Sequence, residues 1–298
     1  MKVLCLLLIG IVAMSWTNKA TSQERPKPGR LPEGVTAKRN LAYVENGHQR
    51  QQLDLYLPEK LDGRLPLIVW IHGGAWLGGS KDSCPAVSFV PKGYAVASIN
   101  YRLSQHAVFP AQIEDCKAAI RWLRAHAAEY HLDAEHIGVW GASAGGHLVA
   151  LLGTTGGVKE LEGPSGNLDQ SSRVQCVVDW FGPANLETMA GGHNAPNSPE
   201  SRLIGGAVSE HLEKARQASP VTYVDKNSAP FLIMHGEADK VVPPGQSDEL
   251  AAVLKKAGVA VQLQVVKGDG HGGTGFASAE NRQLMEDFFA KHLRMPKR

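Results

Sequence analysis

Short apolar runs alternate along this chain with segments in which apolar residues recur every three or four positions. Residues 52–58 alternate, with Leu53, Leu55 and Leu57 on one face, which predicts a half-buried strand. Six further runs are apolar throughout and rich in β-branched residues, as is typical of strands covered on both faces. These runs are residues 67–71, 94–99, 137–140, 174–181, 231–234 and 259–266.

Other segments have the period of an amphipathic helix. Residues 109–130 carry apolar side chains at steps of three and four, which predicts a helix of about five turns. Residues 246–257 repeat the period and stop at Gly258, a residue type that often ends a helix. Residues 279–293 form a third amphipathic pattern, and a shorter one covers 210–218. Each long helix would present one apolar face to a sheet.

Strands and helices that alternate with short connections indicate an α/β protein, because neighbouring parallel strands need a crossover connection. We expect a mostly parallel central sheet of about eight strands flanked by helices, with antiparallel strands added at one edge by the early meander. The sheet would form one domain at residues 41–298, after an exposed lead-in at 23–40. Residues 182–229, polar and rich in Gly, Pro and Asn, predict a small cap or lid over the carboxyl edge of the sheet.

The first 22 residues have the pattern of a secretory signal peptide. Lys2 precedes an apolar stretch at 3–14, and small residues at 20–22 suit cleavage near Ser22. The alternative is a membrane anchor, but the apolar run is shorter than the roughly 20 residues that cross a bilayer. We therefore expect a secreted or periplasmic protein without a stable membrane anchor.

Charge and cysteine content narrow the class of partner. Removal of Lys2 and Lys19 with the signal would leave 29 basic and 29 acidic residues, and this balance predicts no attraction for nucleic acid or anionic lipid. The remaining cysteines, Cys84, Cys116 and Cys176, can form at most one disulfide within the chain, and none has the spacing of a zinc site. The composition favours a neutral or small substrate and no metal.

Ser143 is the first candidate for chemistry. The pentapeptide Gly141-Ala142-Ser143-Ala144-Gly145 lies between an apolar run and a helix-competent segment. Small residues around a serine permit a strained strand-to-helix turn that exposes the hydroxyl, the arrangement known as a nucleophile elbow. The alternative is a close-packed turn of small residues without chemistry, so the interpretation depends on partners elsewhere in the chain.

A serine nucleophile needs a general base and an acid that orients the base. His271, between glycines after the last apolar strand, is the predicted base. Asp239 follows the preceding strand and is the predicted acid, which gives the chain order Ser, Asp, His. Glu237, in the same loop, and Asp179, at the end of the strand after the elbow, remain alternatives for the acid.

The segment His72-Gly73-Gly74-Ala75-Trp76 directly follows a predicted strand. Because glycines let backbone N–H groups face a ligand, we predict that Gly73 and Gly74 form one arm of an oxyanion hole and Ala144 the other. Trp76 is predicted to wall the substrate pocket, with core packing as the alternative. Arg102, in a loop after another strand, could brace the oxyanion loop.

Seven motifs together resemble the α/β-hydrolases of the secreted esterase and lipase group related to hormone-sensitive lipase, and particularly bacterial feruloyl and acetylxylan esterase-like proteins. In chain order they are HGGAW at 72–76, NYRL at 100–103, FPAQ at 109–112, GASAGGH at 141–147, SPVTYV at 219–224, HGEAD at 235–239 and GHG at 270–272. Ala75 and Ala142 stand where relatives of hormone-sensitive lipase usually have a third glycine and an acid. The resemblance implies an α/β-hydrolase fold.

The resemblance and the candidate residues together predict a serine ester hydrolase that needs no cofactor. The resemblance implies acetyl or feruloyl esters on polysaccharide, while short-chain lipid esters fit the same residues. Two alternatives remain: a serine peptidase of the prolyl-oligopeptidase type, and a non-catalytic binding module built on a hydrolase fold. The sequence leaves the oligomeric state open.

Overall fold

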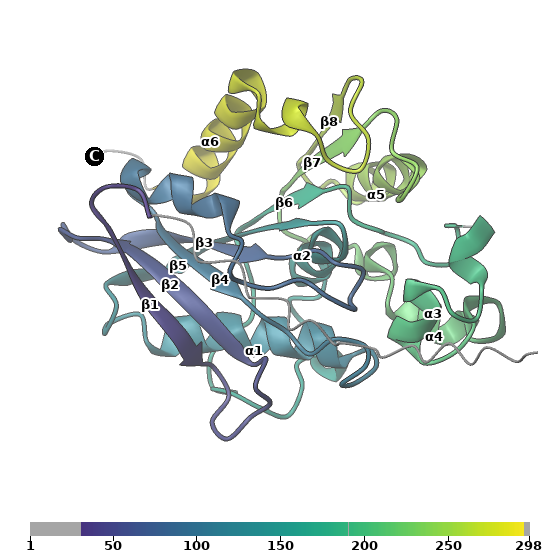
Figure 1. The fold of residues 1–298 in the computed structure, drawn as a ribbon, viewed down its shortest axis with the longest axis horizontal. Coiled ribbons are helices and arrows are strands. Elements are labelled where there is room, and N and C mark those ends of the chain that lie inside the picture. Colours follow the sequence, from purple (N-terminus) through teal and green to yellow (C-terminus); the bar gives the residue numbers. More distant parts are fainter. Residues whose placement is uncertain (1–30, 190, 295–298) are drawn as a thin grey trace, which may run out of the picture.

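The computed structural model describes residues 31–189 and 191–294. Within them, eight strands form one sheet in the order β1-β2-β4-β3-β5-β6-β7-β8. Strand β2 pairs antiparallel with β1 and β4, and all pairs from β4 to β8 are parallel (Figure 1). The strands are β1 Val35–Ala42, β2 Gln52–Pro58, β3 Leu65–Ile71, β4 Ala95–Ile99, β5 Leu132–Ala142, β6 Cys176–Trp180, β7 Phe231–Gly236 and β8 Val261–Val266. The predicted α/β architecture is confirmed, whereas the predicted signal peptide lies outside the described residues.

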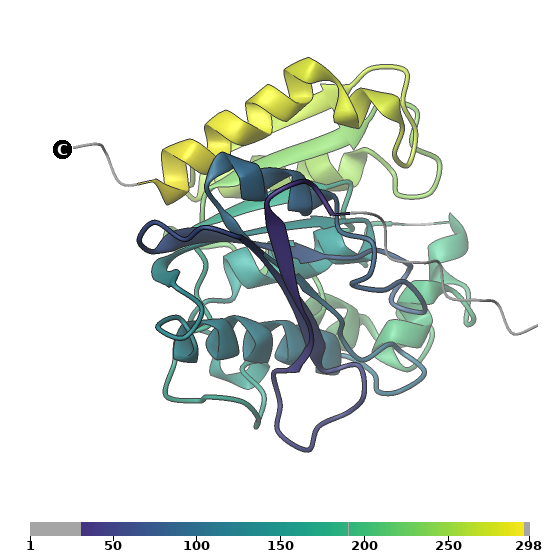
Figure 2. The ribbon, with the colours of Figure 1, turned by 60° about the vertical axis from the view of Figure 1, so that its left-hand side comes forward.

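Helices cover both faces of the sheet. Helices α1, α2 and α5 pack on one face, and α6 with the 3-10 segment Pro85–Lys92 packs on the other (Figures 1 and 2). The helices are α1 Ala111–Ala125, α2 Ala144–Thr154, α3 Pro199–Ile204, α4 Leu212–Gln217, α5 Gly245–Lys256 and α6 Ala279–Leu293. The bounds predicted for the last helix are confirmed.

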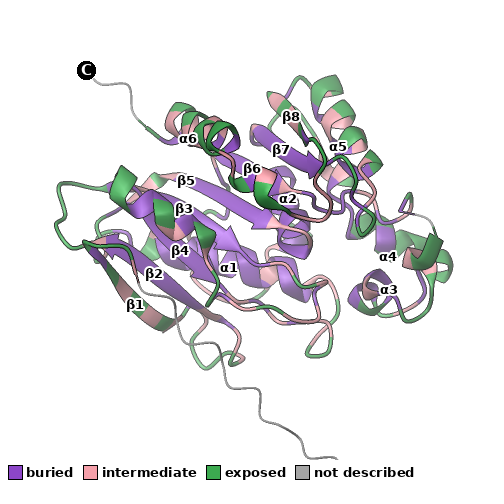
Figure 3. Cartoon of the chain, turned by 45° about the horizontal axis from the view of Figure 1, so that its top comes forward, coloured by how far each residue is buried: buried purple, intermediate pink, exposed green. Residues whose placement is uncertain are grey.

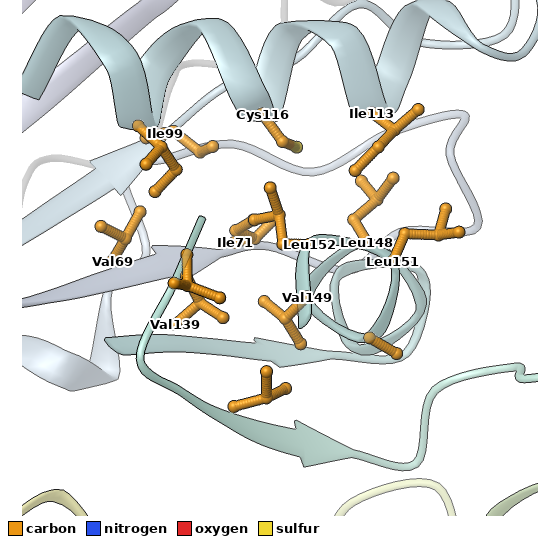
Figure 4. Packing of buried hydrophobic residues seen from close by; sticks show 14 of the residues in the cluster. Val69, Ile71, Ile99, Ile113, Cys116, Val139, Leu148, Val149, Leu151 and Leu152 are labelled. Carbon is orange, nitrogen blue, oxygen red and sulfur yellow. The ribbon is translucent and has the colours of Figure 1, made fainter. Parts of the chain in front are cut away.

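Alternate residues of the central strands enter two separate cores. Val69 and Ile71 of β3 meet Ile113 and Cys116 of α1 on one side of the sheet (Figure 4). Trp70 of the same strand belongs to the core on the other side. Strands β3, β4, β6 and β7 are therefore buried along almost their whole length, which explains their unbroken apolar sequence (Figure 3), whereas residues 133–136 near the start of β5 are partly exposed.

Three element predictions need correction. Helix α1 ends at Ala125, so the rest of the predicted five-turn helix is a turn. Strand β8 lies at the edge of the sheet and is only partly buried, although its sequence predicts cover on both faces. Strand β2 is buried on both faces, and ion pairs with Lys81 (2.6 Å) and Arg39 (2.7 Å) compensate the burial of the Asp54 carboxylate.

The predicted lead-in at 23–40 is wrong from Val35 onward, because β1 begins there and pairs with β2. Alternate residues of β1 are exposed, among them Thr36 and Lys38. A charged, half-exposed strand is typical of a sheet edge, where backbone hydrogen bonds rather than apolar burial define the strand. The strand was not predicted because this segment has few apolar residues.

The predicted cap, residues 182–229, contains α3 and α4 and connects β6 to β7. Figure 1 shows both helices at the end of the molecule toward which the parallel strands point. Leu186, Leu203, Val208 and Ala215 of this insertion belong to the same core as the sheet. The insertion is thus packed into the domain, and its action as a lid remains a prediction.

Cys84, Cys116 and Cys176 are all free thiols, so no disulfide joins these three residues. In the part of the chain that the structure describes, none of the helices combines the length and apolar character of a bilayer-spanning segment.

Candidate active site

Ser143 lies at the sharp turn between β5 and α2. Its backbone has φ 57° and ψ −121°, a conformation that costs a non-glycine residue about 1 to 3 kcal/mol. A Cβ at Gly141 would collide with the carbonyl of Gly145, and a Cβ at Gly145 would collide with the carbonyl of Ile71. The flanking glycines are therefore required by packing, and the turn is a nucleophile elbow in geometry.

The structure brings Ser143, His271 and Asp239 into one hydrogen-bonded chain. Nε2 of His271 lies 2.8 Å from Oγ of Ser143, and Nδ1 of His271 lies 2.8 Å from Oδ2 of Asp239. The carboxylate of Asp239 is buried, while the side chain of His271 is 21% exposed. Since the carboxylate accepts the Nδ1–H proton, Nε2 is left to accept the serine proton.

The two alternative acids lie elsewhere. Asp179 is buried, and its Oδ1 accepts a hydrogen bond from the N–H of Gly182 (2.9 Å). Its Oδ2 has no partner among the described residues, and burial raises the pKa of this carboxyl to about 7. Glu237 is exposed and accepts from the N–H of Gly268 at 3.3 Å. Only Asp239 of the three is hydrogen-bonded to His271.

A second histidine, which the sequence analysis did not single out, supports Asp239. Nε2 of His235 lies 3.2 Å from Oδ2 of Asp239 and 3.0 Å from the carbonyl oxygen of Val242. Its Nδ1 lies 2.6 Å from Oγ of Ser247, and burial lowers the pKa of His235. The position of His235 at the end of β7, four residues before Asp239, was the available signal.

Phe181 packs against the imidazole of His271, with ring centroids 4.6 Å apart. Phe276 meets Phe181 edge to face at 4.9 Å. Phe181 itself has φ 45°, so backbone strain accompanies this contact. These two buried rings limit the orientations open to His271.

The loop after β3 brings backbone N–H groups to the elbow. A Cβ on Gly73 would lie 2.7 Å from the carbonyl oxygen of Ala142 and 3.3 Å from Cβ of Ser143, so the two loops are in close contact. The N–H groups of Gly73, Gly74 and Ala144 donate to no acceptor within residues 31–189 and 191–294. These donors are available to an anionic oxygen beside Ser143.

The predicted pocket wall at Trp76 is wrong. Its indole is 1% exposed and lies in the main core, where its N–H donates to Nδ1 of His147 (3.2 Å). Trp76 and Ala75 have φ values of 56° and 54°, each a left-handed conformation that costs a side-chain-bearing residue about 1 to 2 kcal/mol. Trp76 therefore anchors a strained loop from within.

Arg50 rather than Arg102 braces this loop. The guanidinium of Arg50 donates to Nε2 of His72 and to the carbonyl oxygen of Gly79, both at 3.0 Å. Since arginine only donates, Nε2 of His72 accepts and its Nδ1–H donates to the carbonyl oxygen of Gly73 (2.7 Å). Burial lowers the pKa of His72 to about 4, which keeps this tautomer neutral.

Arg102 instead binds Asp115 on α1 through two nitrogens, with contacts of 2.7 to 3.0 Å. The prediction that it braces the oxyanion loop is therefore wrong. Arg50 lies between β1 and β2, and no motif in the sequence marks it as a partner of the loop.

The residues described in the structure contain no group of three or more His, Cys, Asp or Glu side chains that could hold a metal ion. Cys116 and Cys176 are buried in the cores, where burial raises the pKa of each thiol. The chemistry available at the elbow is that of a serine, an imidazole, a carboxylate and backbone donors.

Fold and site together define an α/β-hydrolase with a serine nucleophile elbow. Residues 53–254, more than half of the chain, match the BD-FAE family, and the chain belongs to this family. The resemblance found in the sequence motifs is confirmed.

Two solved structures share both sequence and fold with this chain. A truncated form of a carbohydrate esterase from gut microbiota is 38% identical, with a TM-score of 0.82 over 86% of this chain and 96% of that chain. A bifunctional GH43-CE protein of Bacteroides eggerthii is 40% identical, also with a TM-score of 0.82, over 87% of this chain and 35% of that chain.

Curated relatives include two proteins of Mycobacterium tuberculosis. The esterase LipC is 32% identical over 84% of this chain and 65% of its own length. The probable carboxylic ester hydrolase LipM is 31% identical over 75% of this chain and 54% of its own length. The chain thus spans between about half and two thirds of these relatives.

Proposed function

We propose that this protein is a serine carboxylic ester hydrolase. The observation that carries the proposal is the unbroken chain from Oγ of Ser143 through His271 to Asp239, with both contacts at 2.8 Å. Membership of the BD-FAE family and similarity to proteins named as esterases support it. Ser143 is the proposed nucleophile, His271 the general base and Asp239 the orienting acid.

In the proposed reaction, Oγ of Ser143 attacks the ester carbonyl while Nε2 of His271 takes the serine proton. The imidazolium that forms is stabilised by the buried carboxylate of Asp239 and then protonates the departing alcohol. Water enters next: His271 removes a proton from it as its oxygen attacks the acyl carbon, and the imidazolium returns that proton to Oγ of Ser143 as the bond to the acyl group breaks and the acid leaves. Apart from the ester and the water, the proposed steps use only the side chains of Ser143, His271 and Asp239.

The N–H groups of Gly73, Gly74 and Ala144 are the proposed oxyanion hole. They stabilise the negative charge that develops on the carbonyl oxygen in both tetrahedral intermediates. Gly73 contacts the elbow directly, and none of these donors has a competing protein acceptor among the described residues. Removal of one such donor typically slows turnover about 10²- to 10³-fold.

We further propose that the substrates are short acyl or feruloyl esters carried by carbohydrate. The structure named as a carbohydrate esterase is 38% identical to this chain and the GH43-CE protein is 40% identical, whereas LipC and LipM are 32% and 31% identical. Small lipid esters are the second class, because the names esterase and carboxylic ester hydrolase of those curated relatives do not restrict the ester to carbohydrate. No cofactor is required for either.

Hydrolysis of p-nitrophenyl acetate, butyrate and octanoate, methyl ferulate and acetylated xylan tests the proposal, with the Ser143→Ala variant as control. We expect turnover of the short esters by the wild type and its loss in the variant, with thermal unfolding nearly unchanged. Serine-independent turnover, or none on any ester, would reject the proposal. Preference for octanoate over acetate would favour lipid esters.

We also propose that the protein is exported after cleavage near Ser22, on the basis of the apolar segment at 3–14 and the small residues that follow. N-terminal sequencing of the protein recovered from culture medium or periplasm tests this. An intact Met1 on the recovered protein would contradict it.

A further inference from the structure

His147 lies in the first turn of α2, four residues after Ser143, and is completely buried. One of its ring nitrogens faces a hydrogen-bond donor and the other faces an acceptor. The indole N–H of Trp76 lies 3.2 Å from Nδ1, and the carbonyl oxygen of Ala218 lies 2.6 Å from Nε2. The rings of Trp76 and His147 also meet edge to face, at 5.1 Å.

These partners fix the tautomer of His147. An indole nitrogen can only donate, so Nδ1 of His147 must be the acceptor. A carbonyl oxygen can only accept, so Nε2 must carry the proton. Both bonds exist together only when the ring is neutral, and burial lowers the pKa of His147 to about 4.

The two bonds join three parts of the molecule. Trp76 belongs to the loop that carries Gly73 and Gly74, and His147 belongs to the helix that starts at the elbow. Ala218 follows α4 in the insertion between β6 and β7. Ser219, the next residue, is bonded to the start of the insertion through the N–H of Leu186 (3.0 Å).

The loop needs such support because two consecutive residues with side chains, Ala75 and Trp76, have positive φ. Outside its own turn, the backbone of Trp76 has one hydrogen bond to another of the described residues, from the N–H of Ser104 to its carbonyl oxygen (2.8 Å). The indole–imidazole bond holds the same residue through its side chain. Without it, the loop could relax and move the N–H groups of Gly73 and Gly74 away from Ser143.

We propose that His147 is a positioning residue for the oxyanion hole. His147 holds the strained loop through Trp76 and connects this loop to the insertion at Ala218. This inference rests on the proposed ester hydrolase function and extends it. The insertion then contributes to turnover through the geometry of the hole, in addition to any contact with substrate.

The test compares His147→Leu, His147→Gln and Trp76→Phe with the wild type. Leucine removes both bonds, whereas glutamine can still accept from Trp76 and donate to Ala218. Trp76→Phe keeps an aromatic ring and removes the donor. Trp122→Phe, a change at a buried tryptophan of α1 outside the site, is the matched control.

We measure kcat and KM on p-nitrophenyl acetate, normalised by titration of the reactive serine, and Ki for a trifluoromethyl ketone that forms a tetrahedral oxyanion adduct. We expect His147→Leu and Trp76→Phe to lower kcat about 10- to 100-fold, because a displacement near 1 Å can have this effect. Ki should rise by a similar factor while KM changes little. His147→Gln and Trp122→Phe should stay within about threefold of the wild type.

Combining His147→Leu with Trp76→Phe should cost no more than the larger single effect, because both remove the same bond. If His147→Leu keeps the full turnover of the wild type, this inference is overturned and the proposed function is not affected. A loss of kcat without a matching rise in Ki, or losses that multiply in the double variant, would do the same. Absence of serine-dependent turnover in the wild type would overturn the proposed function, and the inference with it.

Discussion

At the level of single residues, both carboxylate oxygens of Asp239 have hydrogen-bond partners. Its Oδ1 accepts the N–H groups of Val241 and Val242, at 2.8 and 3.0 Å, while Oδ2 faces His271 and His235. These contacts hold the carboxylate in one orientation. The side chain can therefore select one tautomer of His271.

Asp239→Asn should reduce kcat by up to about 10⁴, because an amide can present a donor to Nδ1 and favour the wrong tautomer of His271. Glu237→Gln is the matched control, since it makes the same kind of change in the same loop at an exposed position. Steady-state kinetics on p-nitrophenyl acetate decide the outcome. A large loss in the Glu237 variant with an active Asp239 variant would reverse the assignment.

Asp179 offers a separate test of pH-dependent stability. Its pKa is about 7 in the folded protein against 3.8 ordinarily, so the folded state keeps a proton that the unfolded chain has released. The contribution of Asp179 to the free energy of unfolding is therefore at its maximum below about pH 4. It falls by up to about 4 kcal/mol as the pH rises to about 7.

Asp179→Asn should remove this dependence. We expect the variant to gain stability relative to the wild type at pH 8 and to lose that advantage at pH 4. Urea unfolding of both proteins across this range measures it. Parallel stability curves for the two proteins would show that Asp179 does not titrate as described.

At the level of elements, the loop between α2 and β6 is held by basic residues of α1. Lys117 and Arg121 each form an ion pair of 2.7 Å with Glu162, and Arg121 also donates to the carbonyl oxygen of Gly166. Both basic side chains are buried, whereas Glu162 is 27% exposed. The loop lies at the amino ends of the parallel strands, away from the elbow.

Glu162→Gln should lower the free energy of unfolding by about 2 kcal/mol, less than for a fully buried pair because Glu162 is partly solvated. The value of kcat per folded molecule should not change. Urea unfolding and kinetics on the same preparation check both statements. A loss of kcat at unchanged stability would show that this loop communicates with the site.

Periodicity predicted the buried elements well and the edges poorly. The central strands and α6 follow their apolar pattern because both are defined by burial. Strand β1 escaped notice because backbone pairing, not apolar content, defines it. Among the site residues, the motifs indicated Ser143, Asp239 and His271 as candidates, whereas nothing in the sequence pairs Arg50 with His72 or His147 with Trp76. Trp76 was misread because the sequence does not reveal the direction of an indole.

At the level of the whole molecule, basic and acidic residues nearly balance, with 31 against 29 in the full chain. Long-range attraction should therefore contribute little to the encounter with substrate. For a neutral ester, we expect kcat/KM to change less than about twofold between 50 and 500 mM NaCl. A steep fall in kcat/KM as the salt concentration rises would show that a local charged surface attracts the substrate.

The three residues at the centre of the site follow β5, β7 and β8, so the site draws on distant parts of the sheet. His271 follows β8, an edge strand of the sheet and the last strand among the described residues. A chain that has folded only through β7 already holds the serine and the acid but has no base. Recovery of ester turnover during refolding would therefore time the docking of β8 and of the loop that carries His271, whereas tryptophan fluorescence would report the burial of Trp70, Trp76 and Trp140 in the two cores.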